Sequence, residues 1–140
     1  MVDIKEEKSK RGKRSRAAGR KFELDVRKNL ESRGYIVCKW TNIVDLDNDC
    51  LIQAKSKYNP FLKRIISEGA GFPDFVVFKL KDFGGYNVFG VESKKSKYLD
   101  AKEKKMAVWL LDNNIFSKIY IAHPIKEGRK RKIVYQRFER

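Results

Sequence analysis

Residues 73–94, PDFVVFKLKDFGGYNVFGVESK, decide the fold that the sequence predicts. The wholly apolar run 75–78 follows Asp74 directly and indicates a short buried strand. The pair Gly84–Gly85 is typical of a tight turn, and residues 86–92 read as the next strand. The segment therefore predicts a β-hairpin with a carboxylate at the start of its first strand.

The second strand ends in polar and charged residues that could take part in catalysis. Glu92 and Lys94 are two residues apart and are expected on one face of the strand, while the Ser93 side chain points to the other and leaves its carbonyl as a backbone ligand. Phosphodiester hydrolysis uses a divalent cation held by oxygen ligands, and a nearby lysine orients the attacking water. The pattern predicts Asp74, Glu92 and Lys94 as catalytic residues. It also predicts Asp74, Glu92 and Ser93 as ligands of Mg²⁺, with Mn²⁺ able to substitute.

The motif gains its specificity from its position. Glu-x-Lys also occurs at 6–8 and 103–105, as expected in a chain with 36% charged residues. Only the copy at 92–94 ends an apolar strand, and Pro73–Asp74 is the only Pro-Asp in the sequence. The alternative is a turn at Pro73–Asp74 and a surface ion pair between Glu92 and Lys94 on an edge strand.

The flanking periodicity predicts an α/β protein with a central mixed β-sheet flanked by α-helices. Apolar residues every fourth position predict a helix that starts at about Ala17 and stops at Gly34. The further elements are a helix at 99–113, a short helix at 60–67, and strands at 35–40, 116–122 and 132–138. We expect one domain, 17–140, with an insert at about 41–71, and a flexible basic arm at 1–16.

Charge is concentrated at both ends of the chain. The formal net charge is +15, and residues 1–21 carry nine Lys or Arg against three acids, while residues 126–140 carry seven against two. Basic segments bind polyanions because phosphates that they neutralise release counterions. DNA is the expected partner, and a solubilising basic tail is the alternative.

Several classes of protein are disfavoured. Cys38, Cys50 and His123 show no zinc-site spacing, and no apolar run approaches the roughly 20 residues of a membrane span. The N-terminus is too charged for a signal peptide. We expect a soluble, cytoplasmic protein without a membrane contact or a small-molecule cofactor.

Residues 17–40 and 72–122 resemble the PD-(D/E)xK nuclease superfamily. Residues 19–23, Gly-Arg-Lys-Phe-Glu, are similar to the first helix of archaeal Holliday junction resolvases, and residues 71–77 to virus-type replication-repair nucleases. The resemblance implies a restriction-endonuclease-like core. It also implies that Glu23, on the first helix, helps to bind the metal, although an ordinary helix-surface acid is the alternative reading.

The chain also departs from both groups. Its link 41–71 is longer than in junction resolvases, which have Val-Asp in place of Pro73–Asp74. Replication-repair nucleases often carry a glutamine on the helix where this chain has Lys-Glu-Lys-Lys at 102–105. These departures leave the superfamily prediction intact and leave the substrate open.

The predicted function is a Mg²⁺-dependent DNA endonuclease that is structure-specific and acts on Holliday junctions or branched DNA in recombination or repair. A homodimer is expected, and Trp109 is a candidate interface residue, with core packing as the other reading. The alternatives are a restriction-type or mobile-element nuclease, and a catalytically silent nucleic-acid-binding module. The residues predicted to bind nucleic acid are Arg11, Lys13, Arg14, Arg16, Arg20, Lys95 and Lys97.

Overall fold

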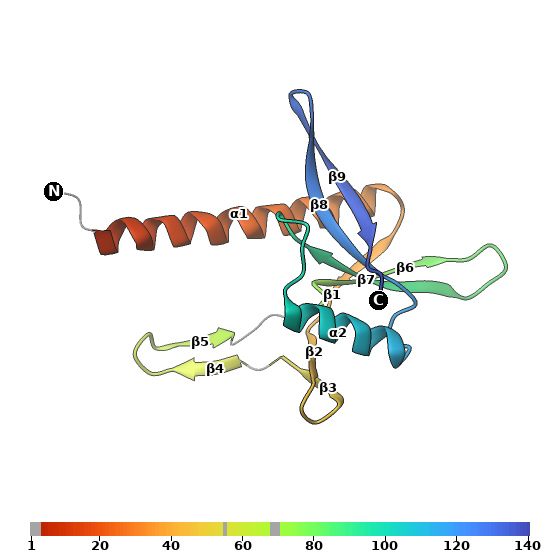
Figure 1. Ribbon diagram of the computed structural model, residues 1–140, viewed down its shortest axis with the longest axis horizontal. Helices are drawn as coiled ribbons and strands as arrows, with labels where there is room; N and C mark the ends of the chain where they lie inside the picture. The colour runs from red at the N-terminus through yellow and green to blue at the C-terminus, as the bar shows by residue number, and fades with distance from the viewer. Residues whose placement is uncertain (1–3, 55, 68–70) are drawn as a thin grey trace.

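The computed structural model, which describes residues 4–54, 56–67 and 71–140, is an α/β protein with helices on both faces of a five-stranded sheet (Figure 1). The sheet order is β1-β6-β7-β8-β9, and only β7 and β8 are parallel. The predicted α/β class with a mixed sheet is confirmed. The elements are α1 (Ile4–Ser32), β1 (Ile36–Lys39), β2 (Asn42–Asp45), β3 (Cys50–Gln53), β4 (Ser56–Asn59), β5 (Arg64–Ser67), β6 (Phe75–Leu80), β7 (Tyr86–Ser93), α2 (Ala101–Asp112), β8 (Ile119–Glu127) and β9 (Lys130–Arg137).

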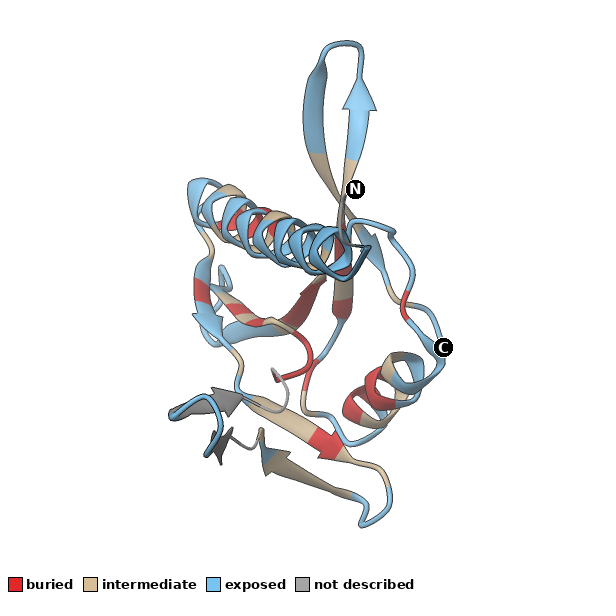
Figure 2. Ribbon diagram, turned by 90° about the vertical axis from the view of Figure 1, so that its left-hand side faces the viewer, coloured by how far each residue is buried: buried red, intermediate tan, exposed pale blue. Residues whose placement is uncertain are grey.

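The two faces of the sheet carry separate cores because strand side chains alternate. On β8, Ala122 packs with the buried residues of α1, whereas Ile119 and Ile121 pack with those of α2. Figure 2 shows the buried residues along the inner sides of both helices. Among the described helices, none is long and apolar enough to cross a membrane.

Helix α1 confirms the predicted apolar stripe but begins earlier than predicted. Phe22, Val26 and Leu30 are its buried residues, and the chain leaves the helix through Gly34 at a φ of 87°. The prediction that the helix starts at about Ala17 is wrong, because residues 4–16 are helical as well. Residues 1–3 lie outside the described part, and flexibility of the basic arm stays a prediction. The segment 4–16 lacks proline and is rich in the helix formers Lys, Arg and Glu, which favours continuation of the helix.

The predicted insert 41–71 contains two β-hairpins, β2–β3 and β4–β5. The prediction of a short helix at 60–67 is wrong, because 64–67 forms β5 and pairs antiparallel with β4. Two adjacent β-branched residues, Ile65 and Ile66, favour a strand over a helix there. Residues 55 and 68–70 of the insert lie outside the described part of the chain.

The last strands are displaced from their predicted bounds. The strand predicted at 116–122 begins only at Ile119, because Phe116 is buried in the α2 core with its ring 5.1 Å from that of Trp40. Strands β8 and β9 then extend into a long hairpin that turns at Gly128 and projects from the sheet (Figure 1). Helix α2 matches its prediction closely, with Asp100 as its N-cap and Asn113 as its C-cap.

Gly90→Ala should destabilise the protein by about 1–3 kcal/mol, because the added methyl group overpacks the sheet. A Cβ at Gly90 would lie 2.6 Å from Cγ of the buried Pro73, whose ring cannot swing away. The free energy of unfolding in urea measures this effect. Gly19→Ala is the matched control: nothing lies within 4 Å of its added Cβ. It should stabilise α1 by about 0.5–1 kcal/mol, and equal effects of the two substitutions would contradict the packing argument.

Candidate active site

Asp74 and Glu92 lie together where β6 begins and β7 ends. The antiparallel register pairs Phe75 with Val91, which brings the preceding Asp74 opposite the following Glu92. Glu92 is 7% exposed and is the one buried charged residue in the described part of the chain. Burial raises the pKa of Glu92 well above its ordinary value, and the charge of Asp74 and a hydrogen bond with it raise it further. The two carboxyl groups are therefore close enough to compete for one proton or one cation.

Ser93 holds Asp74 in place. Its backbone N–H and its hydroxyl both donate to Asp74 Oδ2, over 2.8 and 2.6 Å. The expectation that the Ser93 side chain turns away from the site is wrong. Pairing between β6 and β7 stops at Phe75, so the Asp74 carboxylate reaches across the strand end and accepts from Ser93 there. The proposed role of the Ser93 carbonyl as a metal ligand stays a prediction.

One oxygen of the pair has no partner. Glu92 Oε2 is buried and forms no hydrogen bond in the structure. An unsatisfied buried oxygen carries a desolvation penalty that a bound cation would relieve. Mg²⁺ commonly uses one or two carboxylates together with water and substrate phosphate, so Asp74 and Glu92 fit one such ion.

Glu23 approaches the pair from α1. Partial burial raises the pKa of the Glu23 carboxyl, the negative charge of Asp74 raises it further, and Lys39 opposes both. Glu23 therefore lies within electrostatic range of Asp74. However, no group of three or more His, Cys, Asp or Glu side chains among the described residues is arranged to hold a metal ion. The close donor set is the Asp74–Glu92 pair, and direct ligation by Glu23 stays a prediction.

Lys94 is bound by a residue that the sequence reasoning missed. Its ammonium Nζ lies 2.8 Å from Glu103 Oε2 on α2, and both side chains are partly buried. Burial lowers the pKa of Lys94, but the hydrogen bond to Glu103 and the charges of Glu103 and Glu92 outweigh it, so the net pKa is raised. Lys94 consequently remains an ammonium, between one carboxylate of the acidic pair and one of α2.

Glu103 carries a sequence signal that identifies it in retrospect. It follows Asp100 by three residues, and the two form a capping box: Glu103 N donates to Asp100 Oδ1, and Asp100 N donates to Glu103 Oε1. The cap fixes the Glu103 side chain at the start of α2. Its second oxygen is then free to hold Lys94.

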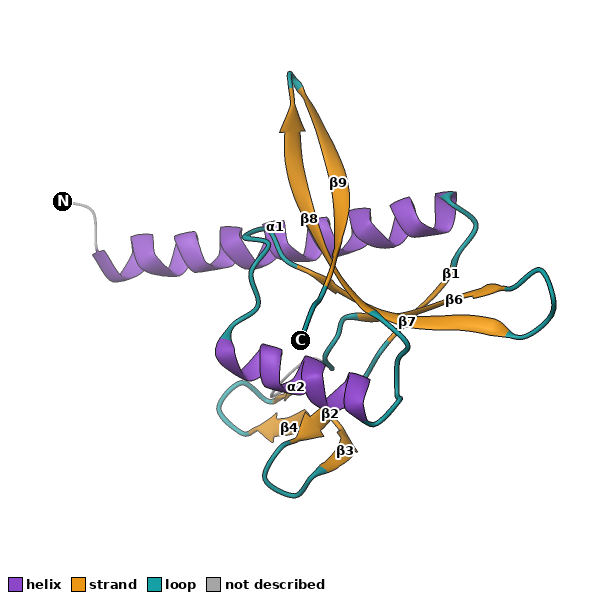
Figure 3. Ribbon diagram, turned by 45° about the vertical axis from the view of Figure 1, so that its right-hand side comes forward, coloured by secondary structure: helices purple, strands orange, loops and turns teal. Residues whose placement is uncertain are grey.

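A basic groove of about 800 Å³ adjoins this site, between α1 and the projecting β8–β9 hairpin. Figure 3 shows the hairpin rising beside the helix. Lys95 is the one predicted nucleic-acid-binding residue that lines it. Four further cations line the groove and were not among the individually predicted contacts, although all lie in the basic segments 1–21 and 126–140: Lys21, Lys126, Arg131 and Lys132. The groove also contains one acid, Asp25.

The other predicted DNA contacts lie on two sides of α1. Spacings of three and four residues align Arg11 and Arg14 with Ala18, which lines the groove. The same spacings align Arg16 and Arg20 with Glu23, on the flank beside the acidic pair. Lys13 lies near that second row, and all five basic side chains are exposed.

Lys97 lies outside the basic groove, and Trp109 packs against the α2 core. Lys97 lies outside the groove, in a turn with a φ of 62°, with Nζ 5.3 Å from the centre of the Tyr98 ring. Trp109 is half-buried, packs against the α2 core, and donates from Nε1 to Asp49 Oδ1 over 2.5 Å. Core packing thus accounts for Trp109.

Comparison with known proteins gives no relative: no protein-family model, no curated protein and no solved structure matches this chain. The chemistry of the site therefore rests on its own residues.

Without divalent cations, the free energy of unfolding of Glu92→Gln should increase relative to that of the wild type as the pH rises. The folded-state pKa of Glu92 is raised, so its contribution to stability is full below the unfolded-state pKa and is lost as pH rises through the folded-state pKa. Glutamine stays neutral and keeps a donor for Asp74. Urea unfolding in EDTA from acid to neutral pH measures the difference.

Glu7→Gln serves as the control, because it removes an exposed carboxylate from the distant end of α1. Its difference from the wild type should be nearly constant across the same pH range. A constant difference for Glu92→Gln as well would show that its burial has no effect on stability.

Proposed function

We propose that the chain is a metal-dependent DNA endonuclease of the PD-(D/E)xK type, with a restriction-endonuclease-like core. The supporting observation is the Asp74–Glu92 pair, in which a buried carboxylate with an unsatisfied oxygen adjoins a second carboxylate and the Lys94 ammonium. Such a group is costly to fold without a function, because it concentrates negative charge away from water.

Each residue of the site takes a distinct role in this proposal. Asp74 and Glu92 hold the cation, Mg²⁺ or Mn²⁺, which neutralises phosphate charge and lowers the pKa of an attacking water. Ser93 orients the Asp74 carboxylate through its two hydrogen bonds. Lys94, kept protonated by Glu103, donates to the phosphate or to the water.

The basic groove supports DNA as the substrate. It lies between α1 and the β8–β9 hairpin and is lined by five lysines and arginines against one acid. Contacts of this kind neutralise phosphates and read the shape of the duplex, not its bases. A structure-specific nuclease for junctions or branched DNA, active in recombination or repair, fits this surface. A homodimer would present two such sites to two strands.

One observation favours a second candidate, a DNA-binding module without catalysis. The Lys94 ammonium is paired with Glu103 at 2.8 Å, so its charge is partly neutralised before any phosphate arrives. A lysine held in this way is a weaker partner for a scissile phosphate. Cleavage assays separate the two candidates.

Wild-type protein should cleave at least one member of a labelled DNA panel when Mg²⁺ or Mn²⁺ is present. The panel contains linear duplex, single strand, flap and four-way junction. Glu92→Ala removes half of the carboxylate pair and should abolish cleavage, while Lys94→Ala should slow it by about 100-fold or more, as expected on removal of a transition-state donor.

Glu7→Ala is the matched control and should leave the cleavage rate unchanged, since Glu7 is exposed on the far part of α1. Binding of the panel without cleavage in either metal would overturn the nuclease proposal and support the binding module. Equal cleavage by Glu92→Ala and the wild type would exclude this site as the catalytic centre.

Alanine at three groove cations, Lys126, Arg131 and Lys132, should weaken DNA binding and reduce the slope of log affinity against log salt by about 1 per lost contact. Fluorescence anisotropy over a salt series measures both. Alanine at Arg11 and Arg14, which extend the groove along α1, should act in the same direction. An unchanged slope in the triple variant would exclude the groove as the phosphate contact.

A further inference from the structure

A second cavity, of about 350 Å³, opens at the opposite end of β7 from the acidic pair. Its lining residues Asn87 and Phe89 lie near the start of β7, and Asn87 is five residues from Glu92, about 17 Å along a strand. The end of α1 and the turn that follows it close one side, through Leu30 and Arg33. The volume falls within the range of small-ligand pockets, about 300–1,000 Å³.

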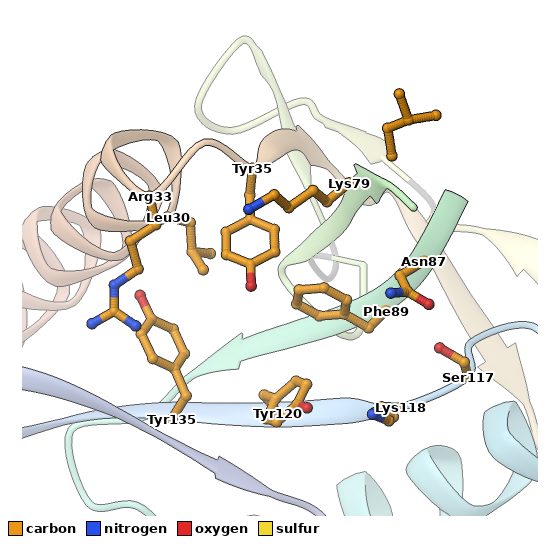
Figure 4. A pocket seen from close by; sticks show the side chains of 11 residues that line it. Leu30, Arg33, Tyr35, Lys79, Asn87, Phe89, Ser117, Lys118, Tyr120 and Tyr135 are labelled. Carbon is orange, nitrogen blue, oxygen red and sulfur yellow. The ribbon is translucent and has the colours of Figure 1, made fainter. Parts of the chain in front are cut away.

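Aromatic rings form much of the lining. Phe89 is the central ring and meets Tyr35 and Tyr120 edge to face, with centroid distances of 5.6 and 5.3 Å. Figure 4 shows these rings and Tyr135 arranged around the hollow. All four are half-buried, so each keeps part of its surface toward the cavity. Such surfaces bind planar aromatic ligands by stacking.

Cations surround the rings. The Arg33 guanidinium lies 5.1 Å from the centre of the Tyr135 ring, and Lys79 Nζ lies 5.2 Å from that of Tyr35. Lys118 adds a third cation, and no acidic side chain is found among the lining residues that the structure describes. The Tyr135 hydroxyl donates to Asn29 Oδ1 at 2.7 Å. The Tyr135 hydroxyl therefore carries no negative charge, and the cavity lining is positively charged as well as aromatic.

We propose that this cavity binds one nucleotide, with its base against Phe89 and Tyr120 and its phosphate at the cations that surround the rings. A planar base joined to a phosphate matches both halves of the lining, and the exposed Asn87 amide can meet a base edge with a donor and an acceptor. The nucleotide is either part of a DNA strand that reaches the acidic pair, in which case the inference rests on the proposed function, or a free nucleotide.

Titration of ¹⁵N-labelled protein with dAMP in EDTA tests the pocket, with deoxyadenosine and inorganic phosphate titrated separately. The amide signals of Arg33, Phe89 and Tyr120 should shift and saturate with dAMP, at lower concentration than with either fragment. Arg33→Ala should weaken dAMP binding about tenfold, and Lys118→Ala should weaken it in the same direction. The control is Lys28→Ala, an exposed cation two residues past Val26 and so on the outer side of α1, which should change nothing.

A short 5′-phosphorylated oligodeoxyadenylate distinguishes the two sources. Shifts of the same amides at lower concentration than dAMP assign the nucleotide to a DNA strand, and shifts with dAMP alone assign it to a free nucleotide. The proposal fails if neither ligand shifts these amides, or if Lys28→Ala weakens binding as much as Arg33→Ala. Because the titration contains no divalent cation, its outcome is independent of cleavage. A protein that cuts DNA but shows none of these shifts refutes the pocket proposal alone. A protein that shows the shifts but does not cut DNA refutes the nuclease proposal alone.

Discussion

The burial of Glu92 beside Asp74 is the constraint on which the rest of the site depends. A buried carboxylate next to a second one requires a proton or a cation, and the nearest ammonium, Lys94, is already shared with Glu103. Ser93 donates a hydrogen bond to one oxygen of Asp74, whereas Oε2 of Glu92 has no hydrogen-bond partner. The surrounding strands and both helices therefore hold together a carboxyl pair that is stabilised when it binds a proton or a cation.

The sequence predicted the parts of the fold that local patterns determine. The hairpin 73–94 and the stripe of α1 follow from periodicity and from glycine turns, which act over a few residues. The errors fall where local signals were weak. Residues 4–16 are basic helix formers without an apolar period, so periodicity places the start of the helix at about Ala17. The prediction of a helix at 60–67 gives too little weight to the β-branched pair at 65–66.

The candidate site was predictable to the extent that it lies on one hairpin. Asp74 and Glu92 meet because adjacent strands pair in register, which the sequence suggests directly. The partners of Lys94 and the lining of the groove depend on the packing of α2 and on the β8–β9 hairpin, which are distant in the chain. The inward turn of Ser93 depends on where strand pairing stops, and alternation of side chains does not specify that point.

The continuous helix α1 fixes the distances between the basic side chains along it. A flexible tether would let its cations reach phosphates at any distance, whereas a helix fixes their spacing at about 1.5 Å per residue. Arg11 is twelve residues from Glu23, about 18 Å along the axis, which corresponds to about five base pairs of B-form DNA at 3.4 Å each. A duplex lying along α1 would thus be contacted by Arg11 roughly half a helical turn of DNA away from the acidic pair. The length of the helix would fix which phosphates Arg11 can contact.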